Sequence, residues 1–138
     1  MVKHINVTTR ARTELIDITD EVREVVKNSR VTSGVCHLFV LHTTAAITIN
    51  EGADPNVMRD MNGFLNRLVP TDPYFTHAEG NSDAHIKSTL VGTSKAVFID
   101  EGRLVLGTLF LQVVSIPALR SAHEFMCFIR RSTIHVSS

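Results

Sequence analysis

Hydrophobic and polar residues alternate in two short runs near the start of the chain, at about residues 3–9 and 13–18. A period of two is the pattern of strands with one buried face, so these runs predict a β-hairpin. Beyond Thr19, which we interpret as the N-cap of a helix, the apolar residues recur at helical spacing, as Val22, Val25 and Val26. This helix is expected to stop before Gly34.

The middle of the chain changes period twice. Residues 35–49 are rich in β-branched and aromatic side chains and too long for one strand, so two strands meeting near Thr43 are predicted. Asp54 and Pro55 have the residue types of an N-cap and of a first helical position. The helix that they begin should run to Pro70, because apolar residues line one of its faces.

A loop over residues 70–81 separates this helix from a shorter one, which should start at Asn81 or Ser82 and end near Leu90. The strands expected after it lie at about residues 96–99, 104–106, 109–116 and 125–129. This order favours an α+β fold, in which a mostly antiparallel sheet is covered by about three helices. A length of 138 residues is typical of one domain, so a single domain over residues 1–138 is predicted.

Composition narrows the possible partners and the compartment. Fourteen basic and fourteen acidic residues cancel, and no Lys/Arg run is longer than two, so a nucleic-acid partner is not expected. No apolar stretch approaches the roughly 20 residues that span a bilayer, and the first residues lack the apolar centre of a secretory signal, so no membrane partner is expected. Two cysteines within apolar segments fit core positions in a cytoplasmic protein.

Three of the seven histidines stand where predicted elements meet, at a strand end, in the loop and at a helix start: His42, His77 and His85. His37 is assigned to the strand of His42, but a separation of five residues would put the two side chains on opposite faces. Three imidazoles are enough protein ligands for a tetrahedral Zn²⁺ with one open position, the arrangement of catalytic sites. A divalent-metal site is therefore predicted, with zinc as the expected ion and magnesium as the alternative for a diphosphate substrate.

Two further features could complete such a site. The backbone N–H groups at the helix start near Asn81 suit a phosphate or a carboxylate, so a small anionic metabolite is the expected partner. Glu51 stands where a strand gives way to the next helix, and it is a candidate general base or a carboxylate that orients a ligand histidine. A solvated loop carboxylate is the alternative for Glu51.

Three blocks carry a family resemblance: "LHTTAAITINEGADPNVMRDM", "HAEGNSDAHIKSTLVGTS" and "GRLVLGT", in this order. Over roughly residues 5–108 the chain is similar to the YjbQ-like family, small proteins often described as secondary thiamine-phosphate synthases. The resemblance implies a compact α+β subunit, assembly as a homotrimer and a metal at the histidine cluster. Carried over residue by residue, the marked positions of the family fall on His42, Thr43, Thr44, Asn50, Glu51, His77, Gly80, Asn81 and His85.

These positions divide into three groups by expected role. The catalytic group is His42 and Glu51, and the metal ligands are His42, His77 and His85. The residues expected to bind substrate are Thr43, Thr44, Asn50, Gly80 and Asn81.

The resemblance weakens over Leu109–Phe125. Leu109 and Phe110 stand where the family usually has Trp-Gln, so a phenylalanine replaces a polar residue. Gln112 has the same strand parity as Phe110 but lies one pleat further along. The departure is compatible with an altered substrate preference and with a loss of activity.

Three functions remain open on this basis. The first is a metal-dependent enzyme that joins a pyrimidine diphosphate to a thiazole phosphate, with the cation and the helix-start donors stabilising the leaving diphosphate. Its weakness is that the sequence places no lysine and no evident arginine cluster at the site. The second is a metal-assisted hydrolase with Glu51 as the proton shuttle. The third is a non-catalytic trimeric module that holds a metal or a small anion.

Overall fold

The computed structural model describes residues 1–115 and 122–132. The elements follow in the order β1 (Val2–Thr8), β2 (Glu14–Asp17), α1 (Thr19–Ser29), β3 (Gly34–Val40), β4 (Ala45–Glu51), α2 (Pro55–Leu68), α3 (Ser82–Val91), β5 (Ser94–Asp100), β6 (Arg103–Leu104), β7 (Leu109–Ser115) and β8 (Ala122–Arg131). The predicted elements are therefore found in the predicted order, except that Ile116 of the strand expected at 109–116 lies outside the described residues.

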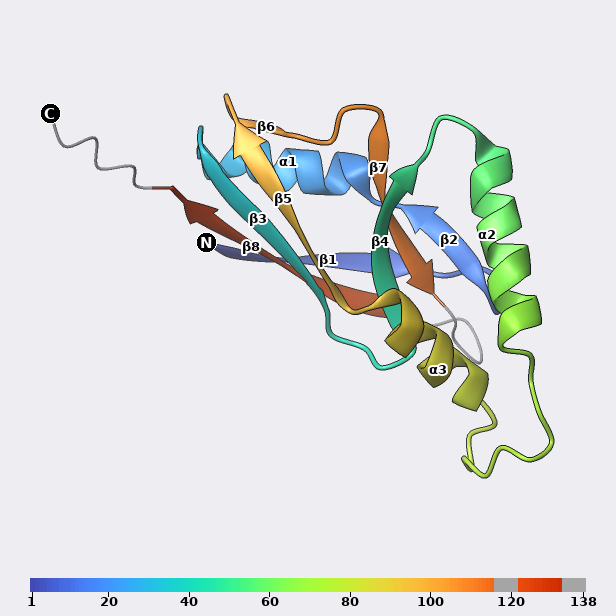
Figure 1. Cartoon of the computed structure of the whole chain (residues 1–138). Coiled ribbons are helices and arrows are strands. Elements are labelled where there is room, and N and C mark those ends of the chain that lie inside the picture. The colour runs from blue at the N-terminus through green and yellow to red at the C-terminus, as the bar shows by residue number, and fades with distance from the viewer. Residues whose placement is uncertain (116–121, 133–138) are drawn as a thin grey trace, which may run out of the picture.

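The strands form two antiparallel sheets (Figure 1). The larger sheet has the order β1-β8-β3-β5-β6, and the smaller one has the order β2-β7-β4. Strand β3 lies inside the larger sheet because it pairs with β5 on one side and with β8 on the other. The predicted α+β class with antiparallel strands and three helices is confirmed, although the single sheet of the prediction is divided in two.

The main core lies among the two sheets and α1. Alternation along β3 turns Cys36, Leu38 and Val40 inward, and β1 contributes Ile5 and Val7 in the same way. From the smaller sheet and α1 the core receives Ala45, Ile47, Leu111, Ile18, Val22 and Val26. Burial of this apolar surface is the main stabilising contribution to the fold.

The two cysteines meet inside this core. Their Sγ atoms are 3.3 Å apart, on the neighbouring strands β3 and β8, and both thiols are free and buried. The hydrogen bond with Cys127, together with burial, raises the pKa of the Cys36 thiol far above its usual range. The prediction that both cysteines fill the core is confirmed.

Helices α2 and α3 cover the outer face of the smaller sheet (Figure 1). Leu15 of β2, Ala46 of β4 and Ala84 of α3 form a second apolar cluster there. Side chains of α2 pack against the cluster from outside, among them Met58, Met61 and Leu65. Within the described residues no helix is both long enough and apolar enough to cross a bilayer.

Two local predictions need correction. Thr19 is the first residue of α1 and not its N-cap, since the N-cap position is taken by Ile18, which has no capping side chain; the Thr19 backbone N–H donates to Asp17 Oδ1. The Thr19 hydroxyl instead accepts the backbone N–H of Leu111, which ties α1 to β7. His42 lies beyond the end of β3 at Val40, so the parity argument that compared it with His37 does not apply.

Glycine at position 34 is required by the close pairing of β3 and β8. A Cβ atom there would lie 2.1 Å from the carbonyl oxygen of Arg130, which is backbone and cannot move alone. We expect Gly34→Ala to lower the free energy of unfolding by about 1–3 kcal/mol, the range for overpacked sites. Urea unfolding followed by circular dichroism measures this change.

Gly63→Ala in α2 is the matched control. A Cβ there would meet only the flexible end of Arg67, at 3.5 Å, and alanine favours the helix by about 0.5–1 kcal/mol. Equal effects of the two substitutions would contradict the close approach at Gly34.

Candidate functional site

Two of the three predicted metal ligands lie together. His77 in the loop before α3 and His85 in its first turns have ring centroids 5.1 Å apart, with the rings nearly perpendicular. The loop is folded back by Gly80, which has a φ of 67° and donates its backbone N–H to the carbonyl of His77 at 3.0 Å. A positive φ is readily adopted by glycine, so Gly80 acts through the backbone turn.

Asn81 and Glu79 lie next to the two histidines and contact them. The Asn81 side-chain N–H donates to Glu79 Oε2 at 3.2 Å, and the same oxygen lies 3.8 Å from Nε2 of His77. The backbone carbonyl of Asn81 accepts the N–H of His85 at 3.4 Å. Asn81 is only 6% exposed, and its buried Oδ1 has no hydrogen-bond partner among the described residues.

An open hollow of about 410 Å³ lies beside the pair. It is lined by His77, Ser82, His85 and Ile86, so both imidazoles reach the solvent side of α3. His77 is partly exposed, with 42% of its side chain accessible. The hollow is large enough to receive a small molecule next to the rings.

The third predicted ligand, His42, stands in the connection between β3 and β4. The backbone N–H of Thr44 donates to Nδ1 of His42 at 3.3 Å, and the Thr44 hydroxyl lies 2.9 Å from the same nitrogen. Because Nδ1 accepts a hydrogen bond, a neutral His42 carries its proton on Nε2. Nε2 of that tautomer is a hydrogen-bond donor, so it can contact an anion but offers no lone pair to a metal.

Thr43, Thr44 and His42 lie next to the second half of α3. This follows from two contacts, since the Ser88 hydroxyl donates to the carbonyl of Ala45 at 2.7 Å and Ile47 N–H donates to the carbonyl of Gly92 at 3.0 Å. His42 and Thr43 are exposed, and Thr44 is buried. Within the described residues no three His, Cys, Asp or Glu side chains form a group that could hold a metal ion.

Asn50 and Glu51 lie at the opposite end of β4. The strand runs from Ala45 to Glu51, and six residue steps in a strand cover about 20 Å. Asn50 contacts α2 there, with its amide N–H donating to Sδ of Met61 at 3.0 Å. Within one chain Glu51 therefore cannot touch a group held by the histidine pair.

Phe110 lies at this same distant end. It pairs with Asn50 across β7 and β4, and its ring packs directly on Gly52, where a Cβ would lie 2.3 Å from the ring. The replacement of a polar residue by Phe110 therefore does not alter the surroundings of the histidine pair. The side chain of Gln112 and residues 116–121 of the divergent segment lie outside what the structure describes.

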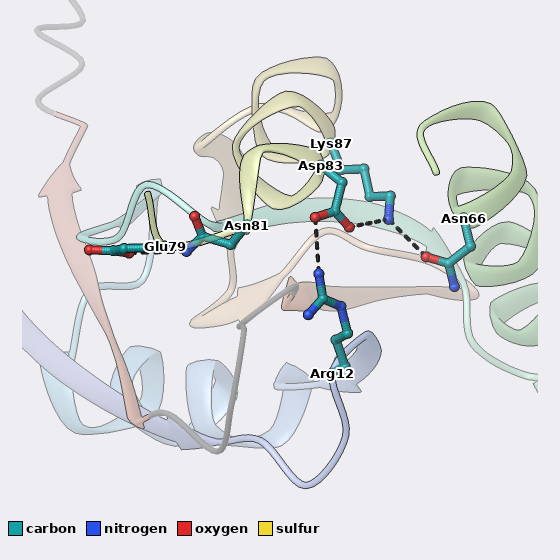
Figure 2. Close-up of polar contacts among 6 residues, drawn as sticks. All are labelled: Arg12, Asn66, Glu79, Asn81, Asp83 and Lys87. Carbon is teal, nitrogen blue, oxygen red and sulfur yellow. Dashed lines mark hydrogen bonds and ion pairs between the residues drawn. The ribbon is translucent and has the colours of Figure 1, made fainter. Parts of the chain in front are cut away.

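A charged cluster that was not predicted from the sequence lies on the inner side of α3 (Figure 2). Lys87 Nζ donates to Asp83 Oδ2 at 3.1 Å and to Asn66 Oδ1 at 2.9 Å. Arg12, from the connection between β1 and β2, donates to Asp83 Oδ1 at 3.2 Å. Asp83 and Lys87 are each only 2% exposed, so this ion pair is buried.

One sequence signal could have identified the buried pair. Asp83 and Lys87 are four residues apart, so on a helix they share one face, whereas Ile86 and Leu90 share another. Either face could have been the buried one, and apolar residues are the usual choice. The structure has the opposite arrangement, with Ile86 and Leu90 exposed.

The sequence matches one family profile, and known proteins that are similar to it carry the same family description. The family profile described as "UPF0047 protein YjbQ-like" matches residues 3–116. A UPF0047 protein of Methanocaldococcus jannaschii is 51% identical over 100 residues, which cover 72% of this chain and 72% of that protein. The UPF0047 protein YugU of Bacillus subtilis is 44% identical over 109 residues, covering 78% of this chain and 83% of the relative.

Solved structures agree with this relationship. A crystal structure described as a YbjQ-like protein of unknown function from Sulfolobus solfataricus superposes with a TM-score of 0.90, at 30% identity, over 96% of this chain and 97% of that one. An uncharacterised protein of the same family from Clostridium acetobutylicum gives a TM-score of 0.89 at 36% identity, over 93% of this chain and 99% of that one.

The buried ion pair provides a test of the inner face of α3. Asp83→Ala leaves Lys87 buried without its carboxylate, and we expect the free energy of unfolding to fall by about 3–5 kcal/mol. Asp83→Asn, which keeps an acceptor for Lys87, should cost less. Denaturant unfolding at equal protein concentration measures both.

Asp20→Ala serves as the control, since Asp20 forms an exposed ion pair with Arg23 at 3.0 Å. Such a pair contributes less than about 1 kcal/mol. A cost for Asp83→Ala no larger than that of Asp20→Ala would show that the inner pair does not stabilise α3.

Proposed function

The chain belongs to the YjbQ-like family, and from this premise we propose that it is a small, cytoplasmic, metal-dependent enzyme acting on an anionic metabolite. The observation that carries the proposal is the approach of His77 and His85 to 5.1 Å beside an open hollow. Pairs of imidazoles that share one exposed site are typical of zinc and other transition metals, whereas magnesium prefers oxygen ligands. Zinc is therefore the proposed ion.

The spacing of the pair suits a shared ion. An imidazole nitrogen lies about 2.0–2.1 Å from zinc, which puts the ring centroid roughly 3 Å from the metal. Two such rings at a tetrahedral angle have centroids roughly 5 Å apart. The observed 5.1 Å falls at that value, so His77 and His85 would need little movement to hold one ion.

Two oxygen atoms next to the pair are the best candidates for further ligands. Glu79 Oε2 is 3.8 Å from Nε2 of His77 and accepts a hydrogen bond from the Asn81 amide, so its exposed side chain would have to shift to reach a shared ion. The buried Oδ1 of Asn81 needs a donor or a cation, because leaving an acceptor unsatisfied costs about 1–3 kcal/mol. Glu79 and Asn81 would thus complete a site that remains open towards the hollow.

The reaction that we propose is the one the family resemblance implies, the joining of a pyrimidine diphosphate to a thiazole phosphate. A bound divalent cation would stabilise the negative charge that develops on the leaving diphosphate. The residues of the chain would position that group: His77 and His85 would hold the cation, and Ser82 lines the hollow beside them. His42, with its proton on Nε2, is the proposed hydrogen-bond donor to the developing negative charge.

Metal-assisted hydrolysis is the second candidate. It is favoured by one contact, because a carboxylate stands 3.8 Å from a ligand histidine and could accept a proton from an attacking water. The carboxylate is Glu79, since Glu51 lies at the far end of β4. If neither reaction is detected, the remaining candidate is a non-catalytic module that binds a metal or an anion.

Assembly as a homotrimer is also part of the proposal. Within the described residues no helix covers the outer face of the larger sheet (Figure 1), and this face exposes apolar side chains of four strands: Val2, Phe39, Phe98 and Phe128. Val2 and Phe128 are paired across β1 and β8, whereas Phe98 and Phe39 lie further along the same face. We propose that other copies of the chain cover this face, since exposed apolar patches mark interaction sites.

The metal site can be tested by removing one imidazole at a time. We expect His77→Ala and His85→Ala each to weaken zinc binding by at least about a hundredfold, because even partners of metal ligands contribute 10- to 100-fold. Zinc content by mass spectrometry and affinity by chelator competition are the measurements. His37→Ala, on the larger sheet, is the matched control and should bind zinc normally.

Activity needs a separate measurement. The zinc-loaded protein is incubated with the pyrimidine diphosphate and the thiazole phosphate, and both the joined product and free phosphate are assayed. The joined product supports the transferase and phosphate release alone supports the hydrolase. Normal zinc binding by both alanine variants would contradict the proposed ligands.

The proposed assembly predicts a trimer that depends on Phe98, which is 71% exposed in the single chain. Phe98→Glu places a charge in the contact and should shift the sedimenting mass to that of the monomer. Tyr74→Glu is the control, since Tyr74 is 88% exposed on the loop between α2 and α3. A wild-type monomer at micromolar concentration would exclude the trimer, and a trimeric Phe98→Glu variant would exclude this face.

A further inference from the structure

A second cavity lies on the side of α3 opposite the histidine pair. It has a volume of about 270 Å³ and is lined by Arg12, Thr13, Asn66, Thr71, Asp83 and Lys87. Ligand pockets for whole drug-sized molecules are typically about 300–1,000 Å³, so this cavity is suited to one small group. The residues come from three separate segments: the β1–β2 connection, the end of α2 with its following loop, and α3.

The two cations beside this cavity have hydrogen-bond donors to spare. The ammonium of Lys87 has three N–H donors, and two of them are used, by Asn66 and Asp83. The guanidinium of Arg12 has five, and among the described residues only one is used, by Asp83. The two carboxylate oxygens of Asp83 are each already engaged by one of these cations.

The charges of the cavity do not cancel either. Arg12 and Lys87 are positive and Asp83 is negative, which leaves one positive charge in excess. Lys87 is 2% exposed, so its unused N–H cannot be satisfied by bulk solvent as a surface lysine would be. A buried charged group with a spare donor gains most from an acceptor, and the cavity beside Lys87 has room for one.

We infer that this cavity is an oxyanion site for the phosphate group of a small metabolite. Lys87, Arg12 and Thr71 line it from different segments, and together they can supply ammonium, guanidinium and hydroxyl donors, which suits a tetrahedral anion with several acceptor oxygens. Asp83 repels an anion but also holds both cations in place. The net attraction is provided by the excess charge and the unused donors.

This site is independent of the proposed metal centre. His77 and His85 line the hollow on the outer side of α3, whereas Asp83 and Lys87 face inward towards Asn66 (Figure 2). Neither histidine lines the inner cavity. Removing a metal ligand should therefore leave phosphate binding unchanged.

The experiment titrates inorganic phosphate into isotope-labelled protein at pH 7, in chloride of matched ionic strength and with a chelator present. We expect saturable shifts of the amide resonances of Thr71 and Lys87. Arg12→Gln should weaken phosphate about tenfold or more, since a charge-assisted hydrogen bond and one unit of charge are lost. Arg10→Gln removes the same charge from an exposed position two residues away and should have no such effect.

Two further variants keep the test decisive. Lys87→Met should abolish the shifts, and if that variant does not fold, Thr71→Val should weaken binding several-fold with the fold intact. Equal weakening by Arg12→Gln and Arg10→Gln would reveal only general attraction to a positive surface and would overturn the inference. Loss of phosphate binding in His85→Ala would place the anion at the histidine pair instead, and acetate binding as tightly as phosphate would overturn the phosphate assignment.

Discussion

The structure depends on a helix that buries its polar face. In α3 the residues Asp83 and Lys87 are buried, whereas Ile86 and Leu90 are 38% and 59% exposed. A buried charge is tolerated only where an opposite charge and hydrogen bonds compensate for its lost hydration. In α3 the carboxylate of Asp83 compensates for the buried ammonium of Lys87, and it also accepts a hydrogen bond from Arg12. Because this network fixes the rotation of α3, it also determines that His85 points outward, towards His77.

Most of the fold could be predicted because its signals are local. The alternation in residues 35–49 marks β3 and β4, and the Asp54-Pro55 pair marks the start of α2, where Asp54 accepts the N–H of Asn56 at 2.8 Å. The division into two sheets was not predictable in the same way. It depends on which strands pair, and β1 pairs with β8 across more than a hundred residues, which no short stretch of sequence encodes. The prediction that Thr19 caps α1 was wrong for a related reason. The Thr19 hydroxyl accepts a hydrogen bond from the backbone N–H of Leu111, which is distant in sequence.

The candidate site could be predicted only where its residues are near one another in sequence. His77 and His85 are separated by a single turn of loop and a helix start, and the structure brings them together. His42 and Glu51 flank the same strand, but the length of β4 holds them about 20 Å apart. The buried cations Arg12 and Lys87 were not assigned to any site from the sequence, and they lie on the side of α3 opposite the histidine pair. Periodicity alone cannot say which face of a ten-residue helix is buried when both faces are mixed.

The two proposed sites have opposite charge requirements, and the first turn of α3 must accommodate both. The N-terminus of a helix carries a partial positive charge, which favours an anion and opposes a bound cation. On the inner side Asp83 is engaged by Arg12 and Lys87, so it cannot offset a cation on the outer side. Glu79 is the carboxylate available there, held near His77 by the Asn81 amide. The Asn81–Glu79 hydrogen bond is therefore the contact that would make a divalent cation electrostatically acceptable next to a helix start. Glu79 would then matter to the proposed metal site through its charge, even without binding the ion directly.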